Sequence, residues 1–154
     1  MSARTDQDTS TATDGGRHPG LKELERLVGT WKMSGETQGE IRYEWFPGKH
    51  FLIARGRIDQ FGKITEHIEI IGYDKPLGAE RPSDVLTSRL YTNAGDTLSY
   101  THEVDDEGVT TWFGEKGSPS LMRAKWSDDG NTLSGAWEWP GGGYKLSLTR
   151  VSKT

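Results

Sequence analysis

Few side chains in this sequence could carry out acid–base chemistry inside a folded domain, and His102 is the first of them. His102 lies between Tyr100 and Val104, where apolar and polar residues alternate, so we expect its side chain on the apolar face. An imidazole titrates near neutral pH and could orient a ligand or act as a general base. It could equally be a core histidine bonded to Tyr43, Tyr100 or a backbone carbonyl, and we favour this structural role.

His67 and Glu69 form a second candidate acid–base pair, two residues apart on one predicted strand. They alternate with Ile68 and Ile70, and apolar residues normally take the core face of a half-buried strand. The pattern therefore predicts that His67 and Glu69 point to solvent. The opposite phase would place both inside and would strengthen the case for an enzyme.

Other kinds of chemistry find little support. The chain has no cysteine, which excludes disulfides and thiolate chemistry, and its net charge of −4 argues against nucleic-acid binding. No two histidines stand at a metal-ligand spacing, no serine has a nucleophile-elbow context, and the glycines at 141–143 follow a proline in a predicted hairpin turn. We expect no metal and no cofactor. Of Arg55, Arg57 and Arg89, at most one is expected inside, where it would suit a carboxylate ligand.

The elements that must position these residues are nearly all strands. The chain of 154 residues has 20 Gly, six Trp and only 32% hydrophobic residues, so large side chains must fill the core of one domain rich in turns. Alternating segments separated by glycine-containing turns predict ten strands. They are expected near 30–36, 39–46, 50–60, 64–73, 84–92, 96–104, 108–115, 120–127, 131–139 and 143–151.

Only one helix is predicted, and a polar segment precedes it. Leu21, Leu24, Leu27 and Val28 recur at helical spacing, and Gly29 stands where a glycine C-cap belongs. Residues 1–18 have no large apolar side chain apart from Met1 and predict a disordered tail. The expected domain organisation is therefore a tail over 1–18 and a single domain over 19–154.

Ten short antiparallel strands joined by hairpins predict an all-β, up-and-down barrel. Closure removes the exposed edges that an open sheet of this size would leave. A two-sheet sandwich is the alternative. A barrel of about ten strands is wide enough to hold a cavity unless large side chains fill it.

Two sets of residues resemble known proteins. The segment from Leu21 to Trp31, a short helix ending in Gly-Thr-Trp, is similar to the opening of calycins, which include lipocalins and fatty-acid-binding proteins. That resemblance implies that Trp31 plugs one end of the barrel and that Arg150, on the last strand, packs over it. Trp45-Phe46-Pro47-Gly48 and Gly72-Tyr73-Asp74 extend the resemblance to an uncharacterised bacterial calycin-like family of the DUF1579 type. The haem of the related nitrobindin-like barrels is not expected, because no histidine follows His102.

The predicted interior is aromatic and nearly uncharged, which suits a small hydrophobic or aromatic ligand held by a few hydrogen bonds. Trp112 and Phe113 are adjacent and must face opposite ways. The candidate ligand-binding residues are Tyr43, Trp45, Tyr100, His102, Trp112, Trp126 and Trp137.

Three functions remain open at this point. The first is binding of a small molecule in the lumen. The second is a cyclase, isomerase or hydratase that uses His102 as acid or base, and the third is a ligand-free structural or interaction module. A homodimer formed through outer strand faces is also open, whereas no apolar run approaches the length of a membrane span. The absence of cysteine and of a signal-peptide core favours a bacterial cytoplasmic protein.

Overall fold

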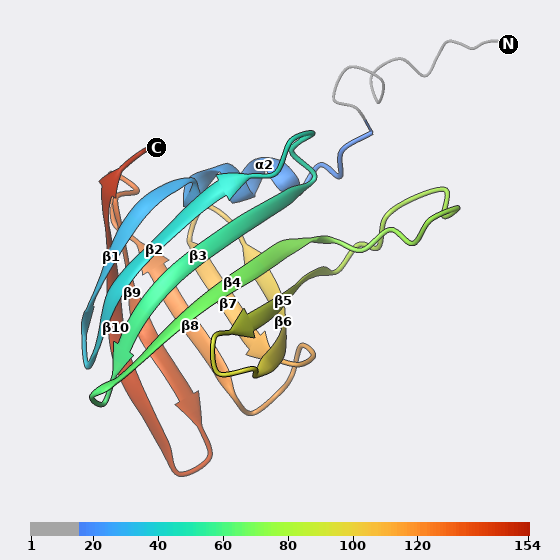
Figure 1. The fold of residues 1–154 in the computed structure, drawn as a ribbon. Helices are drawn as coiled ribbons and strands as arrows, with labels where there is room; N and C mark the ends of the chain where they lie inside the picture. Colours follow the sequence, from blue (N-terminus) through green and yellow to red (C-terminus); the bar gives the residue numbers. More distant parts are fainter. Residues whose placement is uncertain (1–15) are drawn as a thin grey trace, which may run out of the picture.

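The computed structural model describes residues 16–154, which form a closed antiparallel β-barrel (Figure 1). Each strand pairs with its neighbours in the sequence, and β1 pairs with β10 to close the barrel. The strands are β1 (Gly29–Gly35), β2 (Thr37–Trp45), β3 (Phe51–Gln60), β4 (Lys63–Tyr73), β5 (Leu86–Thr92), β6 (Thr97–Val104), β7 (Gly108–Phe113), β8 (Leu121–Trp126), β9 (Thr132–Trp139) and β10 (Gly142–Ser152).

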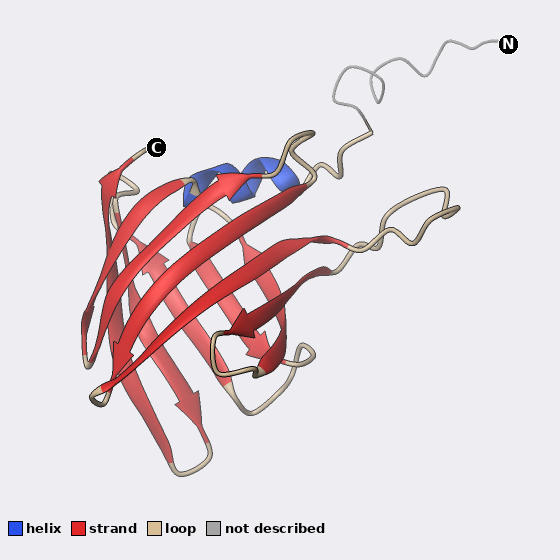
Figure 2. Ribbon diagram, in the orientation of Figure 1, coloured by secondary structure: helices blue, strands red, loops and turns tan. Residues whose placement is uncertain are grey.

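This topology confirms the predicted all-β barrel and excludes the two-sheet sandwich. The ten observed strands match the predicted ten to within a few residues at each end. Such agreement follows from the turn chemistry, because the glycines and prolines between the alternating segments interrupt strands in any antiparallel arrangement. The colours of Figure 2 show that nearly all of the described chain is strand or hairpin loop.

Within the described residues, one helical segment covers one end of the barrel (Figure 2). It consists of the α-helical turn α2 (Leu21–Leu24) and the 3₁₀ turn η1 (Glu25–Leu27), with Leu21, Leu24 and Leu27 buried. The three leucines pack with Leu52, Ile71 and Leu86 from the strands below. We call this the helix end of the barrel, and the end formed by the β1–β2, β3–β4, β5–β6, β7–β8 and β9–β10 hairpins the hairpin end.

Gly29 has a different role from the helix C-cap that the sequence predicts. Gly29 is the first residue of β1 and has a φ of 127°. A Cβ at this position would lie 2.3 Å from the Ser152 carbonyl oxygen on β10. Glycine is therefore required by the close approach of the first and last strands, where the barrel closes.

Trp31 and Arg150 join these two strands at the helix end. Trp31 is completely buried, and its indole Nε1 donates to the Leu27 carbonyl at 2.8 Å. Arg150 is paired with Trp31 in the β1–β10 register, and its guanidinium carbon lies 4.4 Å from the Trp31 ring centre. The expected stacking of the cation on the indole is present, and the pair links the helix to the closing strands.

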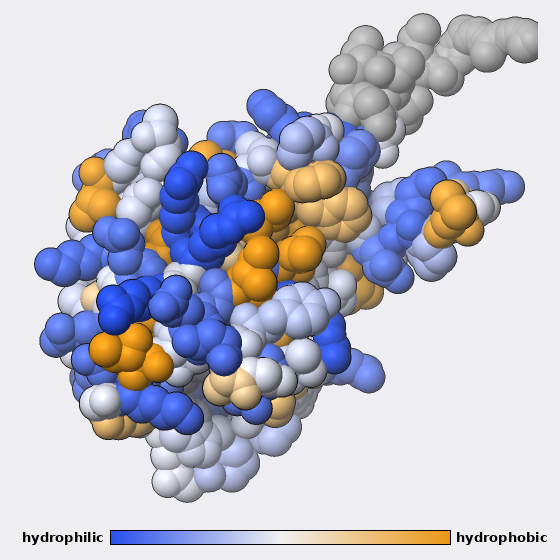
Figure 3. All heavy atoms as spheres, viewed as in Figure 1, coloured by the Kyte–Doolittle hydropathy of each residue, from blue (hydrophilic) through white to orange (hydrophobic). Residues whose placement is uncertain are grey.

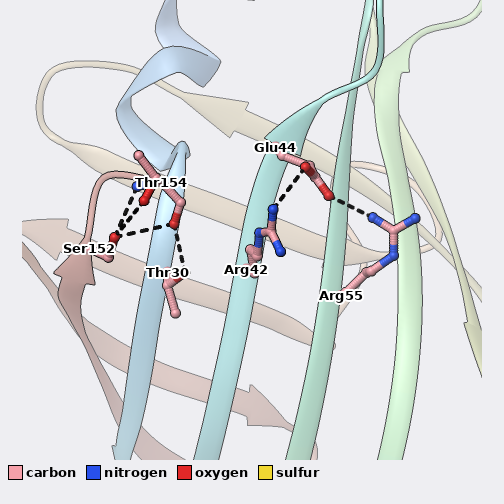
Figure 4. Close-up of polar contacts among 6 residues, drawn as sticks. All are labelled: Thr30, Arg42, Glu44, Arg55, Ser152 and Thr154. Carbon is pink, nitrogen blue, oxygen red and sulfur yellow. Dashed lines mark hydrogen bonds and ion pairs between the residues drawn. The ribbon is translucent and has the colours of Figure 1, made fainter.

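Residues near the chain ends add contacts at the helix end. His18, which the sequence assigns to the tail, stacks on Tyr73 with 3.7 Å between ring centres, and its Nε2 lies 3.0 Å from an Asp84 carboxylate oxygen. Figure 4 shows the Thr30 hydroxyl on β1 donating to the Thr154 carbonyl. The rest of the predicted tail, residues 1–15, lies outside the described residues.

The outer face of β2–β5 carries both charged and apolar side chains. Glu44 lies between Arg42 and Arg55, with ion-pair distances of 3.3 Å and 2.8 Å (Figure 4). Hydrophobic side chains gather over β3 and β4 among charged neighbours (Figure 3), and Ile53 is paired there with Ile70. Arg55, Arg57 and Arg89 are all exposed, in line with the expectation that at most one arginine faces the interior.

Candidate functional site

A cavity of ≈ 310 Å³ occupies the lumen between the helix end and the hairpin end. This volume is at the small end of the range of ligand sites, about 300–1,000 Å³. All ten strands contribute to its wall, each with at least two side chains except β1 and β8, and most of these side chains are apolar or aromatic. The apolar members include Met33, Ile41, Ile58, Ile71, Leu90, Val109, Met122, Leu133, Leu146 and Leu148.

A polar cluster interrupts the apolar wall on the side formed by β4 to β7. The Ser88 hydroxyl donates to Glu69 Oε2 at 2.6 Å and lies 2.7 Å from His102 Nε2. His102 Nδ1 lies 2.8 Å from the Thr111 hydroxyl, and His102 Nε2 lies 3.5 Å from Glu69 Oε2. Glu69, His102 and Thr111 line the cavity, whereas Ser88 lies behind them. We call these four residues the Glu69–His102 cluster.

The hydrogens of this cluster can be placed so that every contact is satisfied with a neutral imidazole. His102 Nε2–H donates to Ser88, the Ser88 hydroxyl donates to Glu69, and the Thr111 hydroxyl donates to Nδ1. The cluster then carries the single negative charge of Glu69. A buried carboxylate needs such partners, because an unpaired charge in an apolar wall is strongly unfavourable.

The pKa values of the neighbouring groups reflect this arrangement. Burial acts to raise the pKa of Glu69, but hydrogen bonds and charge interactions with His102, Ser88 and His67 outweigh it and hold the pKa below its ordinary value. Burial and the Glu69 charge raise the pKa values of the Tyr43 and Tyr100 phenols. The Tyr43 and Tyr100 phenols near the Glu69 carboxylate therefore stay protonated.

His67 completes the polar side of the cavity. Its imidazole lies against the backbone of Gly56 on β3, where a Cβ would come 2.3 Å from Cε1 and 2.8 Å from Nε2. Burial lowers the pKa of His67, and the Glu69 charge opposes this only in part. Glycine at 56 thus makes room for an imidazole that remains neutral at pH 7.

The inward position of His67 and Glu69 shows that the predicted phase of β4 is wrong. Ile70 is 41% exposed on the outer face, whereas Glu69 is buried at 9%. Ile68 and Ile70, on the outer face of β4, are paired with Tyr91 and Ile53 on the neighbouring strands, which cover them in part. The polar residues can face inward because Ser88 donates to Glu69, and because His102 and Thr111 continue the chain of hydrogen bonds from Ser88.

Four of the seven predicted ligand-binding residues line the cavity: Tyr43, Tyr100, His102 and Trp137. His102 has the inward position that the sequence predicts, and its hydrogen-bond partners are the Ser88 and Thr111 hydroxyls. The expected alternatives, Tyr43, Tyr100 or a backbone carbonyl, are not its partners. The sequence analysis did not predict Ser88 and Thr111 as site residues. A serine or threonine on a strand with polar residues on both faces does not by itself indicate a binding site.

The other three predicted residues, all tryptophans, are outside the cavity wall. Trp45 and Trp126 have the inward phase but lie at the helix end. The Trp45 indole donates to Glu25, and the Trp126 ring lies 6.1 Å from that of Trp31. Trp112 is paired with Thr101 rather than His102, so it lies on the outer face of β7, where the Lys116 ammonium lies 5.6 Å from its ring centre.

Aromatic residues surround the hairpin end of the cavity. A second, more open hollow there shares Gln60, Tyr100, Trp137 and Tyr144 with the cavity. Phe61, Phe113 and Trp139 add rings that are 73%, 49% and 40% exposed, respectively. Phe61 and Trp139 both pack edge-on against Tyr144. We call Phe61, Phe113, Trp139 and Tyr144 the aromatic rim, and it marks the side on which the cavity approaches the surface.

Within residues 16–154, no three His, Asp or Glu side chains converge closely enough to hold a metal ion. None of the helices in that part of the chain has the length and apolarity needed to cross a bilayer. Comparison of the sequence with models of known protein families and with curated proteins finds no match. The closed ten-stranded antiparallel barrel is consistent with a calycin-like fold.

Proposed function

We propose that this barrel binds a small molecule in its lumen, with an apolar body against the aliphatic and aromatic wall and one polar group at the Glu69–His102 cluster. The observation that carries the proposal is a cavity of ≈ 310 Å³ that combines an extended apolar wall with one hydrogen-bonded polar side. Ligand sites commonly have this composition, in which a few polar groups orient an otherwise apolar molecule. The same cavity counts against a ligand-free module, for which we expected side chains to fill the lumen.

Family and location are part of the same proposal. The motifs between Leu21 and Asp74 support a calycin-like protein of the DUF1579 type, and the composition supports a bacterial cytoplasmic protein. Neither assignment specifies a ligand, because one fold can host many functions.

Intrinsic tryptophan fluorescence tests the binding proposal. Trp137 lines the cavity and Trp112 lies outside it, so the two residues form a matched pair of reporters. We expect some members of a panel of compact aromatic and isoprenoid molecules to quench the fluorescence and to raise the melting temperature. Trp137→Phe should remove most of the quenching, and Trp112→Phe should leave most of it. Absence of any binder in the panel, with no melting shift, would contradict the proposal.

An acid–base enzyme is the second candidate, and the convergence of His67, Glu69 and His102 on one cavity favours it. A carboxylate and two imidazoles could take a proton from a bound substrate and return it elsewhere. His102→Ala should then abolish turnover while changing substrate binding little. For a binding protein, the same variant should change affinity without any product being formed by the wild type.

A further inference from the structure

The charges of the cavity wall restrict the ligand more narrowly than its apolar character does. Among the described residues that line the cavity there is no lysine and no arginine, and Glu69 is the one carboxylate. The arginines of β3 and β5 point outward, and Arg89 is engaged there with Ser99 and Thr97. No permanent cation is therefore available in the wall to receive an anionic group.

Glu69 gives the site a negative potential. Its Oε2 accepts the Ser88 hydroxyl at 2.6 Å, and the donors around it are a hydroxyl and an imidazole rather than a permanently charged group. His67, the second histidine near this carboxylate, is neutral at pH 7, because burial lowers the pKa of its imidazole. The effect of the Glu69 charge extends to the Tyr43 and Tyr100 phenols.

The aromatic wall also favours a positively charged ligand group. Tyr43, Tyr100, Trp137 and Tyr144 line the cavity, and the faces of such rings attract cations when water is excluded. No described residue forms a hydrogen bond with the Tyr43 or Tyr100 hydroxyl. Burial and the Glu69 charge raise the pKa values of both phenols. These hydroxyls can accept a hydrogen bond from a ligand that also donates to the carboxylate.

We infer that the cavity takes a compact aromatic or alicyclic amine, whose protonated nitrogen lies against the Glu69 carboxylate between the Tyr43 and Tyr100 rings. The inference deepens the proposed function and rests on it. A carboxylate of the same shape would place two anions together in a poorly solvated wall and would be rejected. The volume of ≈ 310 Å³, about ten water molecules at ~30 Å³ each, limits the body to one or two rings.

Three ligands that share one ring system and differ in charge test the inference: naphthylmethylamine, naphthylmethanol and naphthoate. Isothermal titration calorimetry at pH 7 with the full chain gives the three affinities. We expect the amine to bind at least about tenfold more tightly than the alcohol, which corresponds to about 1.4 kcal/mol, and naphthoate to bind most weakly. Glu69→Gln should reduce the amine to the affinity of the alcohol and leave alcohol binding intact.

Glu66→Gln is the matched control. Glu66 lies on the same strand with the opposite phase, is exposed, and does not line the cavity. The Glu66→Gln substitution should leave the affinities for all three ligands unchanged. The ranking of the three ligands on the wild-type protein decides the question even if Glu69→Gln does not fold.

Each other result overturns the inference in a distinguishable way. Equal affinities for amine and alcohol, or tightest binding of naphthoate, would reject the amine while leaving the proposed binding function in place. An equal loss of amine affinity in Glu66→Gln and Glu69→Gln would show that the preference comes from overall surface charge. Absence of binding by all three ligands would reject both the amine and the proposed function.

Discussion

The His67 imidazole rests on the backbone of Gly56, at a point where β3 and β4 pair directly. The backbone of Gly56 has no unusual conformation that would demand glycine, so the missing side chain serves only to make space. Ala54, the preceding inward residue of β3, is paired with Glu69 in the same way. Small residues on β3 thus leave room for the polar side chains of β4.

Gly56→Ala should therefore destabilise the protein through His67. A Cβ 2.3 Å from Cε1 must displace the imidazole, and overpacking of this kind costs about 1–3 kcal/mol. Urea denaturation of Gly56→Ala, His67→Ala and the double variant forms a mutant cycle. In the His67→Ala background the loss from Gly56→Ala should disappear. A similar loss in both backgrounds would mean that the glycine serves the backbone rather than His67.

The low pKa of Glu69 predicts a dependence of stability on pH. Because the folded protein holds the pKa below the ordinary value of 4.5, the unfolded chain takes up the proton first as the pH falls. The stabilisation from Glu69 is thus complete above that value and is lost as the pH falls through the lower, folded pKa. The difference in unfolding free energy between the wild type and Glu69→Gln should shrink over this acid range.

Glu66→Gln again provides the control for this measurement, since Glu66 is exposed on the same strand. Its difference from the wild type should be small at every pH. A Glu69→Gln difference that stays constant between neutral pH and the acid range would contradict the assignment of a low pKa to Glu69.

Arg150 should be a large contributor to stability. Its guanidinium donates to the carbonyls of Val28 and Arg26 and to the Asn131 side chain, and it stacks on Trp31. Loss of several charge-assisted hydrogen bonds and of the ring contact should cost about 2–4 kcal/mol in Arg150→Ala. Chemical denaturation measures this loss.

Arg123→Ala is a suitable comparison, because Arg123 is an exposed arginine on β8. Its effect should stay within about 0.5 kcal/mol, as for most surface substitutions. Equal effects of the two variants would remove the role that we assign to the contact between Arg150 and Trp31.

Phenylalanine is unusual at position 61, because the backbone there has a positive φ. We expect the Phe61 side chain to serve in ligand exchange instead. Phe61 and Gly62 form a two-residue hairpin turn with φ values of 54° and 82°, a conformation that favours Asn-Gly. Phe61→Asn should raise stability by about 1 kcal/mol, the lower end of the range of about 1–3 kcal/mol for an unfavourable backbone conformation. It should also speed dissociation of a lumen ligand such as naphthylmethanol, because the Phe61 ring packs on Tyr144 at the cavity mouth.

Thermal unfolding and stopped-flow fluorescence measure these two effects separately. Higher stability with unchanged dissociation would mean that the Phe61 ring does not restrict the exit. Lower stability would show that the contact between Phe61 and Tyr144 outweighs the strain of the turn.

The sequence by itself determined the architecture, because strands and turns are encoded by residues that are neighbours in the chain. Alternating residues and glycine turns define ten strands and their order, and antiparallel neighbours with no free edge lead to a closed barrel. The contact between Trp31 and Arg150 was implied by the resemblance of the segment from Leu21 to Trp31 to calycins, and the structure shows it. The inward position of His102 was also predictable, because its strand keeps one apolar face.

Only the tertiary structure decided which face of β4 is inside. Ile68 and Ile70 favour one phase locally. Burial of Glu69 becomes favourable because Ser88 donates to it and because His102 and Thr111, from two further strands, complete the chain of hydrogen bonds. The tertiary structure also decided which aromatic residues line the lumen, since Trp45 and Trp126 have the inward phase but pack at the helix end. Alternation along a strand predicts the face of a side chain but not its depth in the barrel or its partners, which depend on the register of distant strands.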